Sequence, residues 1–191
     1  MIKNNIRRES YLKFLNTWKN RDLIKVLSGV RRSGKSTLLA MFQQDLKEQG
    51  VQDENIIAIN FEYMEFEELT DYRKLHDYVL SKVDKNKKNY VFLDEIQHVQ
   101  NFEKVVDSLY IRDYIDLYIT GSNAFFLSGE LATLLTGRYI EQHVLPLSFQ
   151  EFKQWHTENN PTIQQLSNRD LYAMYTRSSF PLTLNIKKME E

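Results

Sequence analysis

Eight consecutive residues, Gly29 to Ser36, combine the residue types that protein loops use to bind phosphate. They read G-V-R-R-S-G-K-S. Gly29 and Gly34 allow the backbone to turn tightly around an anion, with its N–H groups directed inward. Lys35 supplies a cation for the β and γ phosphates of a nucleotide, and the Ser36 hydroxyl is suited to coordinate Mg²⁺. The pattern predicts a loop that binds a nucleoside triphosphate together with Mg²⁺.

The segments on either side of this loop match the strand-loop-helix context that phosphate binding requires. An apolar stretch, Leu23 to Leu27, runs into Gly29, and a helical pattern from Ser36 to Gln49 follows. The start of that helix adds the positive end of its dipole to the anion site. A glycine turn that matches by chance is the alternative, and the flanking strand and helix argue against it. We expect the nucleotide contacts to come from Gly29, Val30, Arg31, Arg32, Ser33, Gly34, Lys35, Ser36 and Thr37.

Two adjacent carboxylates, Asp94 and Glu95, end a second apolar stretch, Tyr90 to Leu93. The carboxyl end of a parallel strand is the edge of the sheet where ligands bind. Asp94 is suited to hold Mg²⁺ with Ser36, and Glu95 is suited to polarise the attacking water as a general base. The alternative is that the two acids cap the next helix. Their position downstream of a phosphate loop favours the catalytic interpretation.

Three further residues are candidates for contact with the transferred phosphoryl group. Ser122 and Asn123 follow the buried stretch Leu117 to Thr120, where a hydroxyl or amide would face the γ-phosphate or the water. The sequence does not separate these two, and an ordinary turn that caps the next helix is the alternative. Arg138 opens the last expected strand, where its guanidinium would neutralise developing charge in its own or a neighbouring subunit. The alternative is an arginine at the surface beside a turn.

The composition indicates one α/β domain in a reducing compartment. The chain has 191 residues and no cysteine, which excludes disulfides, thiolate zinc sites and cysteine nucleophiles. The first ten residues lack the apolar core of a signal peptide, and no apolar run is long enough to cross a bilayer. We therefore expect a cytoplasmic protein that does not interact with membranes.

The net charge of −1 gives no argument for nucleic-acid binding, but the charge is unevenly distributed. Residues 1–37 hold ten Lys or Arg against two carboxylates, a net charge of +8, which leaves −9 for the remainder. A basic region around a phosphate site is expected for a polyanionic ligand. We expect weak DNA binding at most.

Strands alternate with helices along the chain, which predicts a mainly parallel sheet covered on both faces. Together with the glycine-containing loop, this alternation predicts an α/β fold of the P-loop NTPase class, with five strands and a short helical C-terminal segment. We expect strands at 23–27, 55–61, 90–93, 116–120 and 139–145, and helices at 6–19, 36–49, 72–83, 102–111 and 124–135. Residues 1–150 would form the ATPase core, and residues 151–191 a helical extension.

The ordered series G-V-R-R-S-G-K-S-T-L-L, F-L-D-E-I-Q, I-T-G-S-N, L-T-G-R-Y and P-L-S-F-Q-E-F resembles a prokaryotic family of AAA-type ATPases. The resemblance covers about residues 6–152. It implies that Gly29 to Thr37 (Walker A) bind ATP, that Asp94 and Glu95 form the Walker B pair, that Ser122 or Asn123 is the sensor, and that Arg138 is the arginine candidate.

The chain departs from the pattern of that family in one segment. The family usually has Gly-Gly-aromatic-Pro after the core, where this chain has Ser178, Ser179, Phe180 and Pro181. The family also joins the core to a C-terminal domain of poorly understood function. Two interpretations of residues 151–191 stay open: the start of a truncated second domain, or the helical end of a lone ATPase module.

The sequence supports two classes of function. The first is a Mg²⁺-dependent ATPase whose hydrolysis drives a conformational or assembly cycle, with a homo-oligomer and an unknown protein as partners. The second is a nucleotide-gated switch that hydrolyses ATP little or not at all. Glu95 favours the first, because a pure switch needs no general base. A small-molecule kinase is disfavoured because no segment reads as an acceptor pocket or an arginine-bearing lid.

Overall fold

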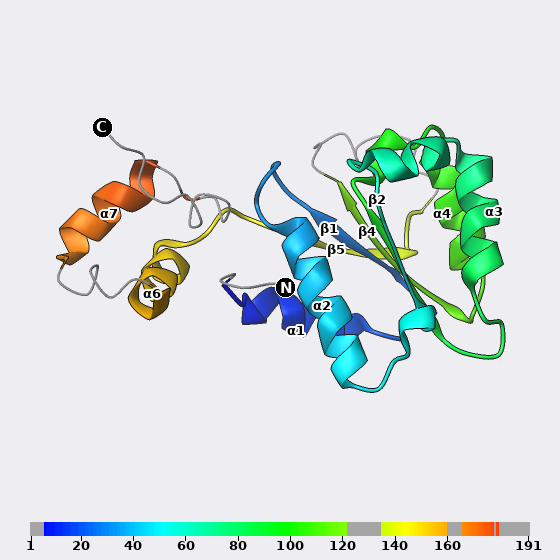
Figure 1. The fold of residues 1–191 in the computed structure, drawn as a ribbon, viewed down its shortest axis with the longest axis horizontal. Coiled ribbons are helices and arrows are strands. Elements are labelled where there is room, and N and C mark those ends of the chain that lie inside the picture. Colours follow the sequence, from blue (N-terminus) through cyan, green and yellow to red (C-terminus); the bar gives the residue numbers. More distant parts are fainter. Residues whose placement is uncertain (1–5, 122–134, 160–165, 178, 180–191) are drawn as a thin grey trace.

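The computed structural model describes residues 6–121, 135–159, 166–177 and 179. Its centre is a sheet of five parallel strands in the order β2-β3-β4-β1-β5 (Figure 1). The strands are β1 (Ile24–Ser28), β2 (Ile56–Asn60), β3 (Asn89–Asp94), β4 (Ile115–Gly121) and β5 (Tyr139–His143). The expected α/β class and its five strands are confirmed, and every pairing is parallel.

Helices follow the strands as a parallel sheet requires, because each return to the same edge needs a crossover. The helices are α1 (Glu9–Trp18), α2 (Lys35–Glu48), α3 (Tyr72–Lys82), α4 (Phe102–Tyr110), α6 (Phe149–Asn159) and α7 (Asn168–Arg177). Short 3₁₀ turns lie at Asp53–Asn55, Met64–Thr70 and Ile96–His98. The helix expected at 124–135 lies outside the described residues except for its last position. No helix of the described part is long and apolar enough to cross a membrane.

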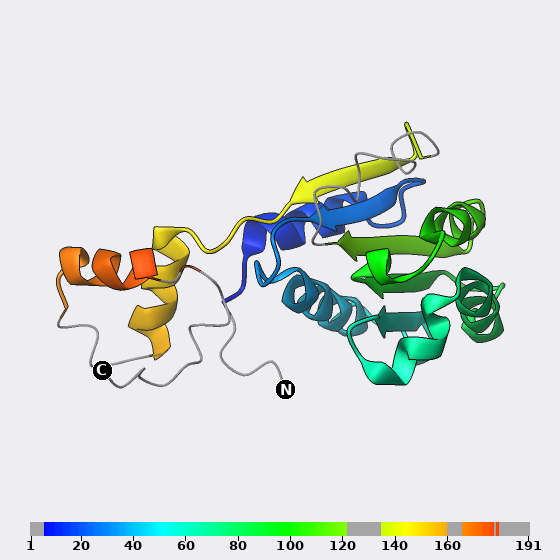
Figure 2. The same cartoon turned by 90° about the horizontal axis from the view of Figure 1, so that it is seen from above.

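The central strands are buried on both faces, and each face has its own core. Alternate residues such as Leu27, Phe92 and Tyr118 pack against α1 and α2, whereas their neighbours pack against α3 and α4. This explains why β1, β3 and β4 read as continuous apolar runs rather than alternating ones. Figures 1 and 2 show the two helical layers on opposite sides of the sheet.

The register brings the carboxyl ends of the central strands together. Ser28 lies opposite Gly121, and Asn60 lies opposite Asp94. The segment after β1 therefore begins beside the ends of β3 and β4, as the sequence predicts for a phosphate loop. In Figure 2 the strands point toward α6 and α7, so the C-terminal helices lie beyond this carboxyl edge.

The first helix begins later than expected. Its pattern predicts a start at Ile6, but α1 begins at Glu9 and Arg8 precedes it with non-helical dihedrals. The reason is tertiary, because the Arg8 side chain is 5% exposed and contacts segments far away in the sequence. The spacing of apolar residues along the chain could not reveal these contacts.

Candidate functional site

Residues Gly29 to Thr37, called here the glycine loop, connect β1 to the first turn of α2. Gly29 has φ +139°, and a Cβ at this position would lie 2.2 Å from the carbonyl oxygen of Val144. Gly34 has φ +100° and precedes α2 in the left-handed region. Arg32 also has a positive φ, 67°. Both glycines are therefore required by backbone geometry, Gly29 by a close approach and Gly34 by its dihedrals.

Asp94 lies beside Ser36, as expected for a shared metal ligand set. The Ser36 side chain hydrogen-bonds Asp94, and Asn60 Nδ2 donates to Asp94 Oδ2 at 2.8 Å. Burial raises the pKa of Asp94 above its ordinary value, and the hydrogen bonds from Ser36 and Thr120 partly offset this. Asn60, at the end of β2, was not singled out by sequence reasoning.

Thr120 joins the two adjacent acids, although no motif identified it. Its hydroxyl donates to Asp94 Oδ1, and its Oγ1 accepts a hydrogen bond from the Glu95 backbone N–H at 2.9 Å. Thr120 is buried on the same face of β4 as Tyr118, so strand parity was the available signal. Ser122 and Asn123, which the sequence favoured, lie outside the described residues.

Lys35 and Glu95 form a buried ion pair at the same edge. Lys35 Nζ lies 3.3 Å from Glu95 Oε1, and it also donates to the carbonyls of Gly29 and Val30 at 3.2 and 3.4 Å. Gln97 Nε2 donates to Glu95 Oε2 at 2.6 Å. Glu95 has left-handed dihedrals, φ 57° and ψ 47°. These dihedrals are unfavourable for a residue other than glycine, so contacts with the surrounding residues must hold Glu95 in this conformation.

The residues of this edge fit ATP and Mg²⁺. Ser33 Oγ is buried in the glycine loop without a hydrogen-bond partner among the described residues, as a group that faces a ligand would be. A hollow of about 280 Å³ opens beside Ser36 and Asp94. Within the described part no cluster of three His or carboxylate ligands exists. One hydroxyl and one carboxylate suit Mg²⁺, which keeps several waters and takes its other ligands from phosphates.

Arg138 lies at the opposite edge of the sheet from the glycine loop. Its carbonyl accepts from the N–H of Ile24, the first residue of β1, whereas the loop follows the last. Its guanidinium pairs with Asp107 and lies 5.9 Å from the Tyr110 ring centre. The full length of β1 therefore separates Arg138 from the glycine loop of its own subunit. A role in a neighbouring subunit stays a prediction.

Five of the ten Lys and Arg side chains of residues 1–37 form ion pairs in the described part of the chain. The paired cations are Arg7 with Glu9 and Asp45, Arg8 with Glu151, Lys25 with Asp116, Arg31 with Glu62, and Lys35 with Glu95. Of these, Arg8, Lys25 and Lys35 are buried. These pairs account for half of the cations in residues 1–37, and weak DNA binding at most stays a prediction.

A five-stranded parallel sheet with a glycine loop after its first strand in sequence, β1, defines the fold class of the P-loop NTPases. The sequence profile of a family described as an AAA domain matches residues 21–153. The chain belongs to this family of AAA-type P-loop ATPases. The expected family is thereby confirmed, and nucleotide binding and hydrolysis are the class of activity that it indicates.

Two curated relatives have no assigned function in their names. An uncharacterized protein of Haemophilus influenzae is 44% identical over 183 residues, which cover 95% of this chain and 45% of the relative. An uncharacterized protein of Methanocaldococcus jannaschii is 38% identical over 141 residues, which cover 71% of this chain and 29% of the relative. The chain thus spans less than half the length of the curated relatives that it matches.

Solved structures share the fold at low sequence identity. The Walker-type ATPase PABY2304 of Pyrococcus abyssi matches with a TM-score of 0.66 and 15% identity, covering 96% of this chain and 68% of that one. Cdc6p of Pyrobaculum aerophilum matches with a TM-score of 0.64 and 12% identity, covering 96% and 58%. AMPPCP-bound DnaA of Aquifex aeolicus matches with a TM-score of 0.61 and 15% identity, covering 93% and 58%.

Proposed function

We propose that this chain binds ATP with Mg²⁺ at the glycine loop and hydrolyses it, and that hydrolysis drives a conformational or assembly cycle. The observation that carries the proposal is the convergence of Lys35, Ser36, Asp94 and Glu95 at one edge of the sheet. These are a cation for phosphate, two oxygen ligands for Mg²⁺ and a carboxylate suited to general-base catalysis.

The contacts of these side chains support one role for each of them. The backbone N–H groups of the glycine loop would bind the phosphate oxygens, with Lys35 as the neutralising cation. Ser36 and Asp94 would hold Mg²⁺, which supplies charge neutralisation for the β and γ phosphates. When Lys35 exchanges Glu95 for phosphate, the Glu95 carboxylate becomes available to accept a proton from the attacking water. Thr120 keeps Asp94 and Glu95 in a fixed relation during this exchange.

The Glu95→Gln variant tests the proposal. The amide keeps the size of the side chain but cannot act as a base, so we expect ATP turnover to fall about a hundredfold or more while affinity is retained. Turnover is measured by phosphate release and affinity by titration with a slowly hydrolysed ATP analogue. If the wild type binds the analogue but turns over no ATP, the chain is a nucleotide-gated switch instead. Parallel loss of binding would assign Glu95 to a structural role.

A cytoplasmic location, an oligomer and a protein partner are further parts of this proposal. Support for an oligomer is the frequency of oligomers among AAA proteins. Mass in solution, measured with and without the ATP analogue, tests it. Mixing Arg138→Ala with Glu95→Gln protein tests whether Arg138 acts in a neighbouring subunit, since the mixture would then recover part of the activity.

A further inference from the structure

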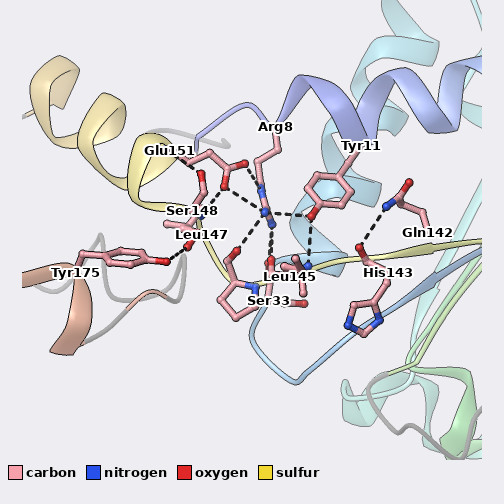
Figure 3. Close-up of polar contacts among 11 residues, drawn as sticks. Arg8, Tyr11, Ser33, Gln142, His143, Leu145, Leu147, Ser148, Glu151 and Tyr175 are labelled. Atoms are coloured by element: carbon pink, nitrogen blue, oxygen red, sulfur yellow. Dashed lines mark hydrogen bonds and ion pairs between the residues drawn. The ribbon is translucent and has the colours of Figure 1, made fainter. Parts of the chain in front are cut away.

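Arg8 makes contacts that no motif of the sequence accounts for. It precedes α1, and its guanidinium is buried between the glycine loop and the start of α6 (Figure 3). Nε donates to Glu151 Oε1 at 2.8 Å, and Nη2 donates to Glu151 Oε2 at 3.3 Å. This fork-like pairing is the strong and directional form of an arginine–carboxylate contact. Arg8 therefore has its orientation set by a residue 143 positions away in the chain.

The same guanidinium reaches the glycine loop. Nη1 donates to the carbonyl of Ser33 at 3.2 Å, and to the carbonyl of Leu145 at 2.8 Å. The Tyr11 ring lies 4.4 Å beneath the guanidinium, which restricts its position further. One buried cation thus ties together three segments: the glycine loop, the connection after β5, and α6.

The Ser33 carbonyl is informative because it shares a peptide unit with the Gly34 N–H. In a planar trans peptide these two groups point in opposite directions. A hydrogen bond that holds the carbonyl toward Arg8 therefore holds the Gly34 N–H toward the other side. Gly34 has φ +100° and no Cβ, so its own side chain does not resist rotation of this peptide. The Arg8 contact supplies the restraint that the glycine lacks.

Glu151 is fixed to the beginning of α6. Its Oε2 accepts from the Ser148 backbone N–H at 2.7 Å, and its own N–H donates to Ser148 Oγ at 3.2 Å, which is a reciprocal helix cap. From α7, the Tyr175 hydroxyl donates to the Leu147 carbonyl at 2.9 Å. Any displacement of α6 from the core must therefore move Glu151 and release Arg8.

We propose that Arg8 is a positioning residue for the glycine loop, and that Glu151 makes this positioning depend on the attachment of α6 and α7. The C-terminal helices then regulate nucleotide affinity: docked helices hold the Gly34 N–H in its phosphate-binding direction, and displaced helices release it. By reciprocity, bound nucleotide favours the docked arrangement. This inference rests on the proposed function for the nucleotide itself, but the link between the loop and α6 exists without it.

The experiment measures affinity for a slowly hydrolysed ATP analogue in Arg8→Gln, Glu151→Gln and the double variant. Loss of Arg8 is expected to weaken binding about tenfold or more, the scale of a hydrogen bond from a charged donor. Loss of Glu151 is expected to weaken it severalfold, and the double variant should equal Arg8→Gln because both act through one contact. Arg7→Gln is the matched control, since Arg7 is the adjacent arginine, pairs with Glu9 and Asp45 at the surface, and should leave affinity unchanged.

Amide hydrogen exchange without nucleotide separates this inference from the proposed function. In Glu151→Gln protein, exchange is expected to accelerate at residues 29–36, far from the substituted side chain in sequence, and Arg7→Gln should not reproduce this. Failure of wild-type protein to bind the analogue would overturn the proposed function alone. Unchanged loop exchange in Glu151→Gln, or additive losses of affinity in the double variant, would overturn the coupling.

Discussion

The strands begin at the amino edge of the sheet and finish at its carboxyl edge. Each of these two edges holds a buried lysine–carboxylate pair, and the two pairs differ in their surrounding hydrogen bonds. At the amino edge, Lys25 pairs with Asp116; at the carboxyl edge, Lys35 pairs with Glu95. All four residues are 5% exposed or less. Burial alone therefore does not separate a structural pair from one suited to chemistry, and the surrounding hydrogen bonds must do so.

The amino-edge pair is closed. Asp116 Oδ2 also accepts from the Asn20 N–H at 2.9 Å and from the Tyr118 hydroxyl at 2.8 Å, while Lys25 donates to the Arg21 carbonyl at 2.8 Å. The Tyr118 ring, with Lys25 Nζ 5.4 Å from its centre, stacks against Phe92. Every charge has a fixed partner, so exchange with a ligand would leave buried groups unsatisfied.

The carboxyl-edge pair is looser. Lys35 Nζ lies 3.3 Å from Glu95, and its contacts with the Gly29 and Val30 carbonyls are 3.2 and 3.4 Å long. The neighbouring Asp94 has a raised pKa because burial disfavours its charge. A cation brought to this edge would relieve that cost. The comparison supports the proposal that the closed pair stabilises the fold and that the looser pair exchanges partners when nucleotide binds.

Removal of Lys25 should have the largest effect on stability. Lys25→Met leaves Asp116 buried without its cation, so we expect a loss of about 3–5 kcal/mol in the free energy of unfolding. Urea denaturation measures the loss, and affinity for the ATP analogue is measured on the folded fraction. A stable Lys25→Met protein with impaired nucleotide binding would reverse the roles assigned to the two pairs.

Removal of Lys35 should instead act on binding. Lys35→Ala takes away the cation for the β and γ phosphates, and we expect affinity for the ATP analogue to fall at least about a hundredfold. The loss of stability should be smaller than for Lys25→Met. Titration calorimetry and urea denaturation of the same sample give both values. Unchanged affinity would contradict the assignment of the glycine loop to phosphate.

Thr120→Val tests the two hydrogen bonds of the Thr120 hydroxyl at the carboxyl edge. Valine keeps the shape but removes the hydroxyl that bridges Asp94 and the Glu95 backbone, so turnover is expected to fall about tenfold. Affinity for nucleotide should be almost unchanged. Thr120→Ser restores the hydroxyl and should recover most of the activity. Equal losses in the serine and valine variants would show that the methyl group matters rather than the hydrogen bonds.

We expect the smallest effect from loss of the Arg8–Glu151 pair, and this effect should depend on pH. Burial acts to raise the pKa of Glu151, but the hydrogen bonds from Arg8 and Ser148 outweigh it and lower the pKa below 4.5. A carboxyl with a lowered pKa in the folded state stabilises the protein above pH 4.5, and loses this contribution as pH falls through the lowered value. At pH 7 the free energy of unfolding of the wild type should exceed that of Glu151→Gln by about 1 kcal/mol. The difference should vanish in strong acid, as measured by urea denaturation at several pH values.

The features that could be predicted from the sequence lie in short contiguous segments. The spacing of Gly29, Gly34, Lys35 and Ser36 follows from the geometry of one turn and one helix start. Alternating strands and helices predict a parallel sheet, because only that arrangement buries such continuous apolar runs. Asp94 was identified at a strand end for the same local reason, and the structure places it beside Ser36.

Contacts between residues that are distant in the chain became known from the three-dimensional fold. Thr120 contacts Asp94 across 26 positions, and Arg8 contacts Glu151 across 143. Strand parity indicates which face of β4 Thr120 occupies but not which residue it contacts, and an arginine before a helix carries no local sign of a partner. Their roles depend on the register of β3 with β4 and on the docking of α6 beyond the carboxyl edge. The order of strands also placed Arg138 at the edge opposite the glycine loop, because the start and end of a parallel strand lie at opposite edges of the sheet.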